Sequence, residues 1–440
     1  MVSRNPPRLR AQPRASDSGL MNAVPRVVVL GGGFAGLETS FLLRMRAHSK
    51  VDITLVSERD TFLFKPNTIY IPFGADPESF LVPLRKPAYK QHIDLVQGRA
   101  RAVDPDRRLV SLEDGSAIPY DFLVIGTGAD MRPEEVPGLA EHAATIWTPG
   151  AMLDLGRRLE EVRARAAAGT DQEILFVVPP NNKCAGPLYE IVFMLETWLR
   201  RKGVRDRVKL TWSTFEQSFI QAFGPRLHEV VVAEFAERGI EGHTGEVVES
   251  VGAGAAQFAG GVERRFDQLI SFPPYIAACS FDGLPADDRG FIETDLETRQ
   301  VAGHPDIYAP GDAGDFPVKQ AFLAMLQADA AADHIAAQVG LKAFDQPFDP
   351  VSMCVMEMLD KATFAQVPLR VTGDPARPVE VRPDADGDYK VGVSPAWRLG
   401  KKVLGFYLPM RFNAGEPFHA GAAWQLMDVG LKGMAGALAD

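Results

Sequence analysis

Cysteine is scarce in this sequence. Only Cys184, Cys279 and Cys354 occur among 440 residues. Three scattered cysteines exclude a disulfide scaffold, and no CxxC or CxxCH motif is present. The sequence still allows one redox-active cysteine pair with the third cysteine as a free thiol. The eight histidines form no HExxH or other metal-binding spacing, so we expect no metal site.

Long apolar runs and an excess of positive charge are also missing. No run of about 18 uncharged apolar residues occurs, so we expect no transmembrane helix. Residues 1–24 carry four arginines and three prolines but lack the apolar core of a secretory signal, and we interpret them as a disordered leader. The net charge of −10 argues against non-specific nucleic-acid binding.

Glycine, by contrast, is abundant, at 40 residues. Residues 26–31 read as a buried strand that runs into glycines, 34–47 as a helix and 51–57 as a second strand. A similar order begins at residues 173–178 and continues to the strand at 208–214. This arrangement predicts an α/β fold with two Rossmann-like dinucleotide-binding domains.

The first unit carries GxGxxG in the segment Gly31-Gly32-Gly33-Phe34-Ala35-Gly36. Gly31 allows the tight turn, Gly33 allows the backbone to approach a diphosphate, and Gly36 allows close helix packing. The helix N-terminus offers N–H groups to the phosphates. Either Ser57 or Glu58, at the end of the next strand, is expected to bind a ribose hydroxyl. The alternative is a glycine-rich turn without a ligand.

Two later segments favour a bound flavin nucleotide. YDFLVIGTG ends a strand at Thr127-Gly128, and IYAPGD ends another at Gly311-Asp312, where the carboxylate suits a ribityl hydroxyl. Lys319, expected in the first turn of a helix over about 318–339, would stabilise negative charge on the reduced flavin. Lys65 and Ala100 are further candidate cofactor-binding residues. We predict FAD as the cofactor.

The second unit has lost its glycines. Pro179 and Pro180 follow its first strand, so no diphosphate cradle is evident and we expect NAD(P)H not to be the donor. Cys184 immediately precedes the expected helix, whose N-terminus would lower the pKa of the thiol together with Lys183. Glu190, one to two turns on, is a candidate proton carrier. A buried inert cysteine and an exposed helix carboxylate are the alternatives.

Together these residues resemble the sulfide:quinone oxidoreductases and the flavoprotein subunits of flavocytochrome c sulfide dehydrogenase. The resemblance rests on GGGFAGLE, FLFKPNTIYIPFG, the run Cys-x-Gly-Pro-x-Tyr-Glu at 184–190, and APGDAGDFPVK at 309–319. It implies a glutathione-reductase-like FAD fold and a redox pair formed by Cys184 and Cys354. Sulfide would attack the Cys184–Cys354 bridge, electrons would pass through FAD to ubiquinone or menaquinone, and sulfur would leave as polysulfide or sulfane sulfur. Family members often carry a third cysteine after the strand equivalent to 120–126. It is absent here, and we interpret Cys279 as structural. The flavocytochrome relatives bind flavin covalently through an early cysteine; because no cysteine precedes Cys184 here, non-covalent FAD is expected.

The expected domains are a leader at 1–24, an FAD-binding domain from 25–150 and 286–345, a second Rossmann-like domain at 151–285 carrying Cys184, and a C-terminal domain at 346–440 carrying Cys354. The last of these contains GKKVLGFYLPMRF at 400–412, whose lysines and aromatic residues suit a membrane surface. Residues 420–438 place Trp424, Met427, Leu431, Met434 and Leu438 on a helical stripe. This stripe faces a membrane, the protein core or the second subunit of a dimer.

We therefore expect a peripheral membrane enzyme, and the sequence does not specify the side of the membrane. A homo-oligomer is compatible with the sequence. Phe406, Tyr407 and Phe412 are candidates for the quinone pocket. The alternatives are a type II NADH:quinone oxidoreductase, a flavoprotein subunit that reduces a cytochrome, and a non-enzymatic flavin-binding scaffold or redox sensor.

Overall fold

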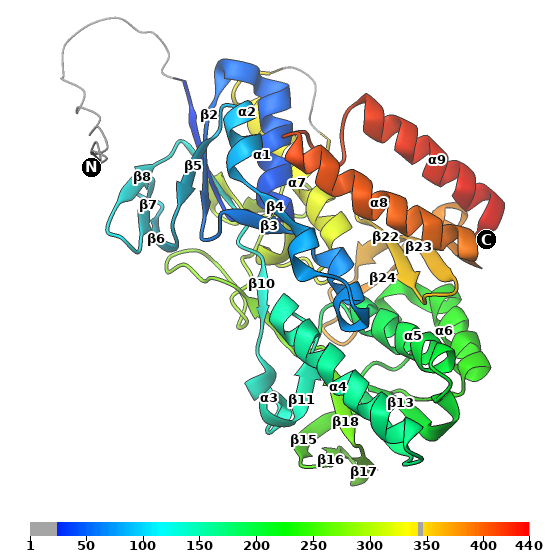
Figure 1. Cartoon of the computed structure of the whole chain (residues 1–440). Coiled ribbons are helices and arrows are strands. Elements are labelled where there is room, and N and C mark those ends of the chain that lie inside the picture. Colours follow the sequence, from blue (N-terminus) through cyan, green and yellow to red (C-terminus); the bar gives the residue numbers. More distant parts are fainter. Residues whose placement is uncertain (1–23, 342–345, 440) are drawn as a thin grey trace, which may run out of the picture.

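The structure is a computed structural model that describes residues 24–341 and 346–439. The leader expected at 1–24 therefore lies outside the described residues except for Val24. Figure 1 shows the course of the chain, with the two C-terminal helices along one side of the molecule.

A six-stranded sheet forms the first α/β unit, with strand order β20-β21-β9-β1-β2-β5. All its neighbours are parallel except β20 and β21. The helices α1 (Phe34–Ala47) and α7 (Ala321–Gln338) pack on it through a shared apolar core. The strands are β1 (Arg26–Leu30), β2 (Asp52–Ser57), β5 (Asp94–Gln97), β9 (Phe122–Ile125), β20 (Gln300–Val301) and β21 (His304–Tyr308).

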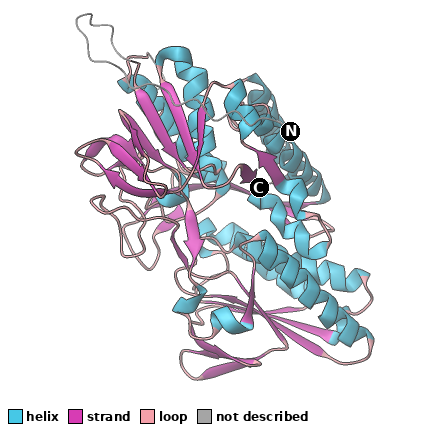
Figure 2. Ribbon diagram, turned by 60° about the vertical axis from the view of Figure 1, so that its left-hand side comes forward, coloured by secondary structure: helices cyan, strands magenta, loops and turns pink. Residues whose placement is uncertain are grey.

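A five-stranded parallel sheet forms the second unit, in the order β11-β18-β12-β13-β14. Figure 2 shows the two sheets as separate groups of strands flanked by helices. The strands are β11 (Ala143–Thr145), β12 (Gln172–Val178), β13 (Val208–Thr214), β14 (Ile240–His243) and β18 (Gln268–Ser271). The helices are α4 (Pro149–Ala167), α5 (Gly186–Arg201) and α6 (Gly224–Arg238).

Smaller strands and helices connect the two sheets or lie beside them. β10 (Ala129–Met131) pairs with β19 (Tyr275–Ala277), so the chain passes between the two units in both directions at one place. The others are β3 (Thr61–Leu63), β4 (Leu81–Pro83), α2 (Arg85–Lys90), β6 (Ala100–Asp104), β7 (Leu109–Leu112), β8 (Ala117–Pro119), α3 (Leu139–His142), β15 (Val248–Gly252), β16 (Ala255–Phe258) and β17 (Val262–Arg265). Residues 268–277 form two strands rather than one, because Pro273 and Pro274 interrupt the ladder.

The C-terminal part is an antiparallel sheet followed by two helices. β23 (Ala362–Val371) pairs with β22 (Val351–Glu357), β24 (Val379–Val381) and β25 (Lys390–Ser394). The helices α8 (Pro395–Asn413) and α9 (Ala422–Leu438) lie side by side and share an apolar contact around Tyr407, Trp424 and Leu431 (Figure 1). In the part of the chain that is described, no helix is long and apolar enough to cross a bilayer. The predicted α/β class with two Rossmann-like units is confirmed.

Candidate functional site

A cavity of about 590 Å³ lies where the first sheet, the loop after β12 and the helices α8 and α9 meet. Most candidate site residues from the sequence line it. These are Gly31, Gly33, Phe34, Ala35, Ser57, Glu58, Lys65, Ala100, Thr127, Gly128, Asp312 and Lys319, together with Cys184, Glu190 and Cys354. Gly36 and Gly311 are not among the residues that line it.

The glycines after β1 shape one wall of this cavity. Gly31 has φ of +106°, and a Cβ there would lie 2.3 Å from Gly126 O. A Cβ on Gly36 would lie 2.0 Å from Gly31 O, whereas a Cβ on Gly33 would meet nothing within 4 Å. Gly33 also supplies no side-chain cap to α1. Gly31 and Gly36 therefore bring the helix N-terminus close to the strand, and Gly33 leaves room in front of the helix for a diphosphate.

Several polar groups face the same space. Thr127 Oγ1 is buried and has no hydrogen-bond partner among the described residues. Burial raises the pKa of Asp312, against the opposing charges of Lys319 and Lys65. Ser57 donates its hydroxyl to Arg59 O at 2.8 Å, and Glu58 pairs with Arg99 at 3.1 Å. A bound dinucleotide would supply hydroxyl and carbonyl groups to this wall, so the residues fit FAD.

Two lysines bring positive charge to the cavity. Enclosure by protein lowers the pKa of Lys65 to about 8, and its Nζ lies 3.3 Å from the centroid of the Trp147 ring. Burial lowers the pKa of Lys319 to about 7, and its Nζ donates to Gly314 O. The predicted place of Lys319 in a helical first turn is wrong, because α7 begins two residues later, at Ala321.

Cys184 and Cys354 line the cavity together, and each carries a free thiol. Burial raises the pKa of Cys184 to about 12, and the nearby Cys354 contributes to the rise. The expected lowering of the Cys184 pKa is therefore wrong. The N–H of Gly186 does favour the thiolate, but burial outweighs it. Burial also raises the pKa of Cys354 to about 12, with Glu190 adding to the rise and Lys401 opposing it.

Glu190 is a buried carboxylate that faces this cysteine pair. Its Oε1 accepts a bond from Glu357 N at 2.7 Å and one from Lys401 Nζ, which also donates to Val355 O at 2.8 Å. Burial raises the pKa of Glu190, and Lys401 offsets part of the rise. The alternative of an exposed helix carboxylate is therefore wrong.

A second carboxylate extends this polar cluster, and sequence reasoning missed it. Glu357 is fully buried and accepts bonds from Tyr70 Oη at 2.8 Å and from Arg398 Nε at 2.7 Å. Burial and the charge of Glu357 raise the pKa of Tyr70. Lys401 was also missed as a site residue. The sequence signal that could have identified Lys401 is its position on the inward-facing stripe of α8, at helical spacing from Trp397, Leu404 and Leu408.

The C-terminal helices differ in detail from the expectation. Phe406 is exposed, Tyr407 packs against Trp424, and Phe412 is buried among Phe41, Phe62 and Phe418. None of the three lines the cavity. The residues of α8 and α9 that do are Lys401, Leu404, Gly405, Leu408 and Trp424. The stripe from Trp424 to Met434 packs inward, whereas Leu438 is exposed.

Hydrogen bonds of the Asn182 side chain hold the loop after β12 in place. Asn182 Nδ2 donates to Phe272 O at 2.9 Å, and Cys184 N donates to Asn182 Oδ1 at 3.0 Å. The loop therefore holds a cysteine at the end of β12, where a glycine turn would hold a diphosphate.

Comparison with known proteins agrees with this geometry. Residues 25–158 match the pyridine nucleotide-disulphide oxidoreductase family. The sulfide-quinone reductase of Aquifex aeolicus is 32% identical over 220 residues, which are 49% of each chain. The mitochondrial sulfide:quinone oxidoreductase of Dictyostelium discoideum is 25% identical over 68% of this chain and 67% of its own. The crystal structure of the Aquifex aeolicus enzyme superposes with a TM-score of 0.80 at 22% identity, covering 93% of this chain and 96% of that one.

The chain is similar to sulfide:quinone oxidoreductases in sequence and in fold. The resemblance predicted from the sequence is thereby confirmed, and with it FAD as the cofactor. The matched sequence is about half the length of the Aquifex relative and two thirds that of the Dictyostelium relative. Type II NADH:quinone oxidoreductases match as well, for example that of Mycobacterium tuberculosis at 24% identity over 65% of this chain and 66% of its own.

Proposed function

We propose that this protein oxidises sulfide through a Cys184–Cys354 redox pair and passes the electrons by way of FAD to a membrane quinone. The observation that carries the proposal is the meeting of both cysteines in the FAD cavity, beside a buried Glu190–Lys401 pair. The relatives named above as sulfide:quinone oxidoreductases support it.

The first step is thiol–disulfide exchange. Hydrosulfide attacks the Cys184 sulfur of the bridge, a new S–S bond forms there, the Cys184–Cys354 bond breaks, and Cys354 leaves as a thiolate. The high pKa of Cys184 does not oppose the attack, since the incoming hydrosulfide is the nucleophile. The high pKa of Cys354 does disfavour its departure, so this thiolate needs a nearby cation. Lys401 faces Cys354 and stabilises the departing charge.

The second half of the reaction requires electrons and protons to reach an acceptor. FAD, when bound, supplies reversible two-electron chemistry. Reduction of a quinone also consumes two protons, and Glu190 is suited to hold one because burial raises its pKa. The apolar wall formed by Met353, Leu404, Leu408 and Trp424 suits a quinone ring.

Access to quinone would come through the C-terminal helices. The outer face of α8 and α9, which we call the C-terminal apolar surface, consists of Leu399, Val403, Phe406, Met410, Leu426 and Val429. Leu399 and Phe406 are 66% and 72% exposed. Such a surface beside the lining residues Leu404 and Leu408 supports peripheral docking on a bilayer.

Anaerobic titration of the purified protein tests the proposal. Sulfide is expected to bleach the visible absorbance of the flavin, NADH is not, and an added short-chain quinone restores the absorbance. Cys184→Ser and Cys354→Ser should each retain FAD and lose the response to sulfide. Bleaching by NADH with no response to sulfide would instead identify a type II NADH:quinone oxidoreductase.

A further inference from the structure

The two cysteines reach the cavity from separate parts of the chain. Cys184 lies two residues before α5, and Cys354 lies within β22. A disulfide requires the two Cα atoms to lie within about 7 Å with suitably directed Cβ atoms. The position of β22 along α5 therefore controls whether the bridge can form.

Two sets of contacts hold β22 against α5, one near the cavity and one at the C-terminal end of α5. Near the cavity, Glu190 of α5 accepts the Glu357 N–H at the end of β22. Farther along α5, Arg201 Nη2 donates to Leu359 O at 2.9 Å, in the turn that joins β22 to β23. Arg200 Nη2 donates to Asp360 in the same turn, at 2.8 Å.

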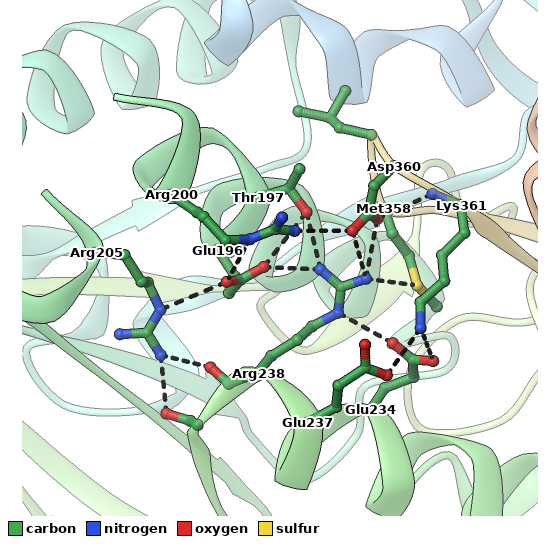
Figure 3. A network of polar contacts seen from close by, with 12 residues as sticks. Glu196, Thr197, Arg200, Arg205, Glu234, Glu237, Arg238, Met358, Asp360 and Lys361 are labelled. Carbon is green, nitrogen blue, oxygen red and sulfur yellow. Dashed lines mark hydrogen bonds and ion pairs between the residues drawn. The ribbon is translucent and has the colours of Figure 1, made fainter. Parts of the chain in front are cut away.

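Arg238 of α6 lies at the centre of this second set of contacts (Figure 3). Its guanidinium bonds Glu196 of α5 at 2.7 Å, Glu234 at 3.0 Å and Asp360 at 2.9 Å. The Arg238 side chain is only 4% exposed, whereas that of Asp360 is 31% exposed. One planar cation therefore joins α5, α6 and the turn of the β22–β23 hairpin through directed bonds.

We propose that Arg238, acting through Asp360, is a positioning residue that sets the β22–β23 hairpin against α5 and so holds Cys354 in bonding register with Cys184. The inference rests on the proposed function, because it concerns the same cysteine pair. Neither Arg238 nor Asp360 lines the cavity, so neither touches the cofactor or the reacting sulfur atoms.

The test variant is Asp360→Asn, which removes one charge from the turn and preserves the shape of the side chain. Arg238 keeps its two buried partners, Glu196 and Glu234. The matched control is Glu237→Gln. Glu237 also bonds this turn, through Lys361 at 2.9 Å, but Lys361 keeps Glu234 at 2.7 Å and Arg238 is untouched. Arg238→Lys, which keeps the charge and loses the fork, is the second test variant.

The measured quantity is the equilibrium between the Cys184–Cys354 disulfide and glutathione in the FAD-loaded protein, read by alkylation and mass spectrometry. Loosening the hairpin lowers the effective concentration of one thiol at the other. Asp360→Asn should shift the equilibrium constant toward the dithiol about tenfold, or about 30 mV, and Glu237→Gln less than about twofold. Arg238→Lys should shift it in the same direction as Asp360→Asn.

A purely structural role for the network predicts a different result. In that case Asp360→Asn would lower the melting temperature and leave the equilibrium constant within about twofold of wild type, which overturns the proposal. An equal shift in Glu237→Gln would overturn it too, since any loosening would then suffice. Failure of the wild-type protein to form the bridge in oxidised glutathione refutes the thiol mechanism itself, before any variant is compared.

Discussion

Replacement of Lys401 by methionine probes the buried ion pair that faces the cysteines. The Lys401 and Glu190 side chains are only 11% and 8% exposed, so solvent screens their interaction weakly. Lys401→Met preserves most of the side-chain volume and leaves Glu190 without its cation. Breaking a buried pair from one side costs about 3–5 kcal/mol, and we expect a loss of that size at neutral pH.

The loss should depend on pH in a definite direction. Burial already raises the pKa of Glu190, and removal of Lys401 raises it further. Between the unfolded pKa and this raised value, the native variant binds more protons than the unfolded chain. Its stability therefore falls as the pH rises through that window, by up to about 1.4 kcal/mol per pH unit. Below the window Glu190 is neutral in both states, and the deficit against wild type is smallest.

Thermal release of FAD fluorescence across a pH series measures this deficit. The matched control is the double variant Lys401→Met with Glu190→Gln, in which the unpaired carboxylate is gone. It should recover most of the stability and show little of the pH slope. The reasoning is refuted if the single and double variants melt alike at neutral pH, or if the single variant shows no slope beyond that of wild type.

Three further changes test other parts of the site. Gly31→Ala should abolish FAD retention, because φ of +106° is strained for alanine and its Cβ would lie 2.3 Å from Gly126 O; flavin content after gel filtration measures this. Leu399→Glu with Phe406→Glu, on the C-terminal apolar surface, should weaken co-sedimentation with vesicles at least about tenfold, with sulfide-dependent bleaching unchanged. Cys279→Ser should leave that bleaching at the wild-type rate: Cys279 lines the same cavity, but the charged groups that act on it include Arg99 and Glu58, and neither Cys184 nor Cys354 is among them; a slower rate would give this thiol a redox role.

The fold was predictable because its signals are local. The apolar strand before Gly31 and the apolar periodicity of the helix after Cys184 need only neighbouring residues to be read. The GxGxxG spacing then fixes how strand and helix meet, and Gly31 and Gly36 lie at the two close approaches that the motif requires. Most of the cofactor wall followed from the same reasoning, since it is built at the ends of predicted strands.

The errors came from non-local surroundings. Cys184 does precede a helix, but its pKa is set by enclosure beside Cys354, which is far away in sequence. Lys401 looked interfacial in GKKVLGFY, yet its partners Glu190 and Val355 come from other elements. Phe412 likewise joins a core made by Phe41 and Phe62, which the aromatic pattern of α8 alone does not reveal.

The two faces of α8 connect the separate parts of the proposed reaction. Leu399, Val403, Phe406 and Met410 recur at helical spacing on its exposed side, and Trp397, Lys401, Leu404 and Leu408 recur on its inner side. Because a helix turns about 100° per residue, these stripes are fixed relative to each other by the backbone. A bilayer that binds the outer stripe therefore brings a lipid-soluble acceptor within one helix diameter of Leu404 and Leu408. Lys401 on the inner stripe contacts Glu190 of α5 at the same time, so α8 links the proposed quinone site to the buried acid.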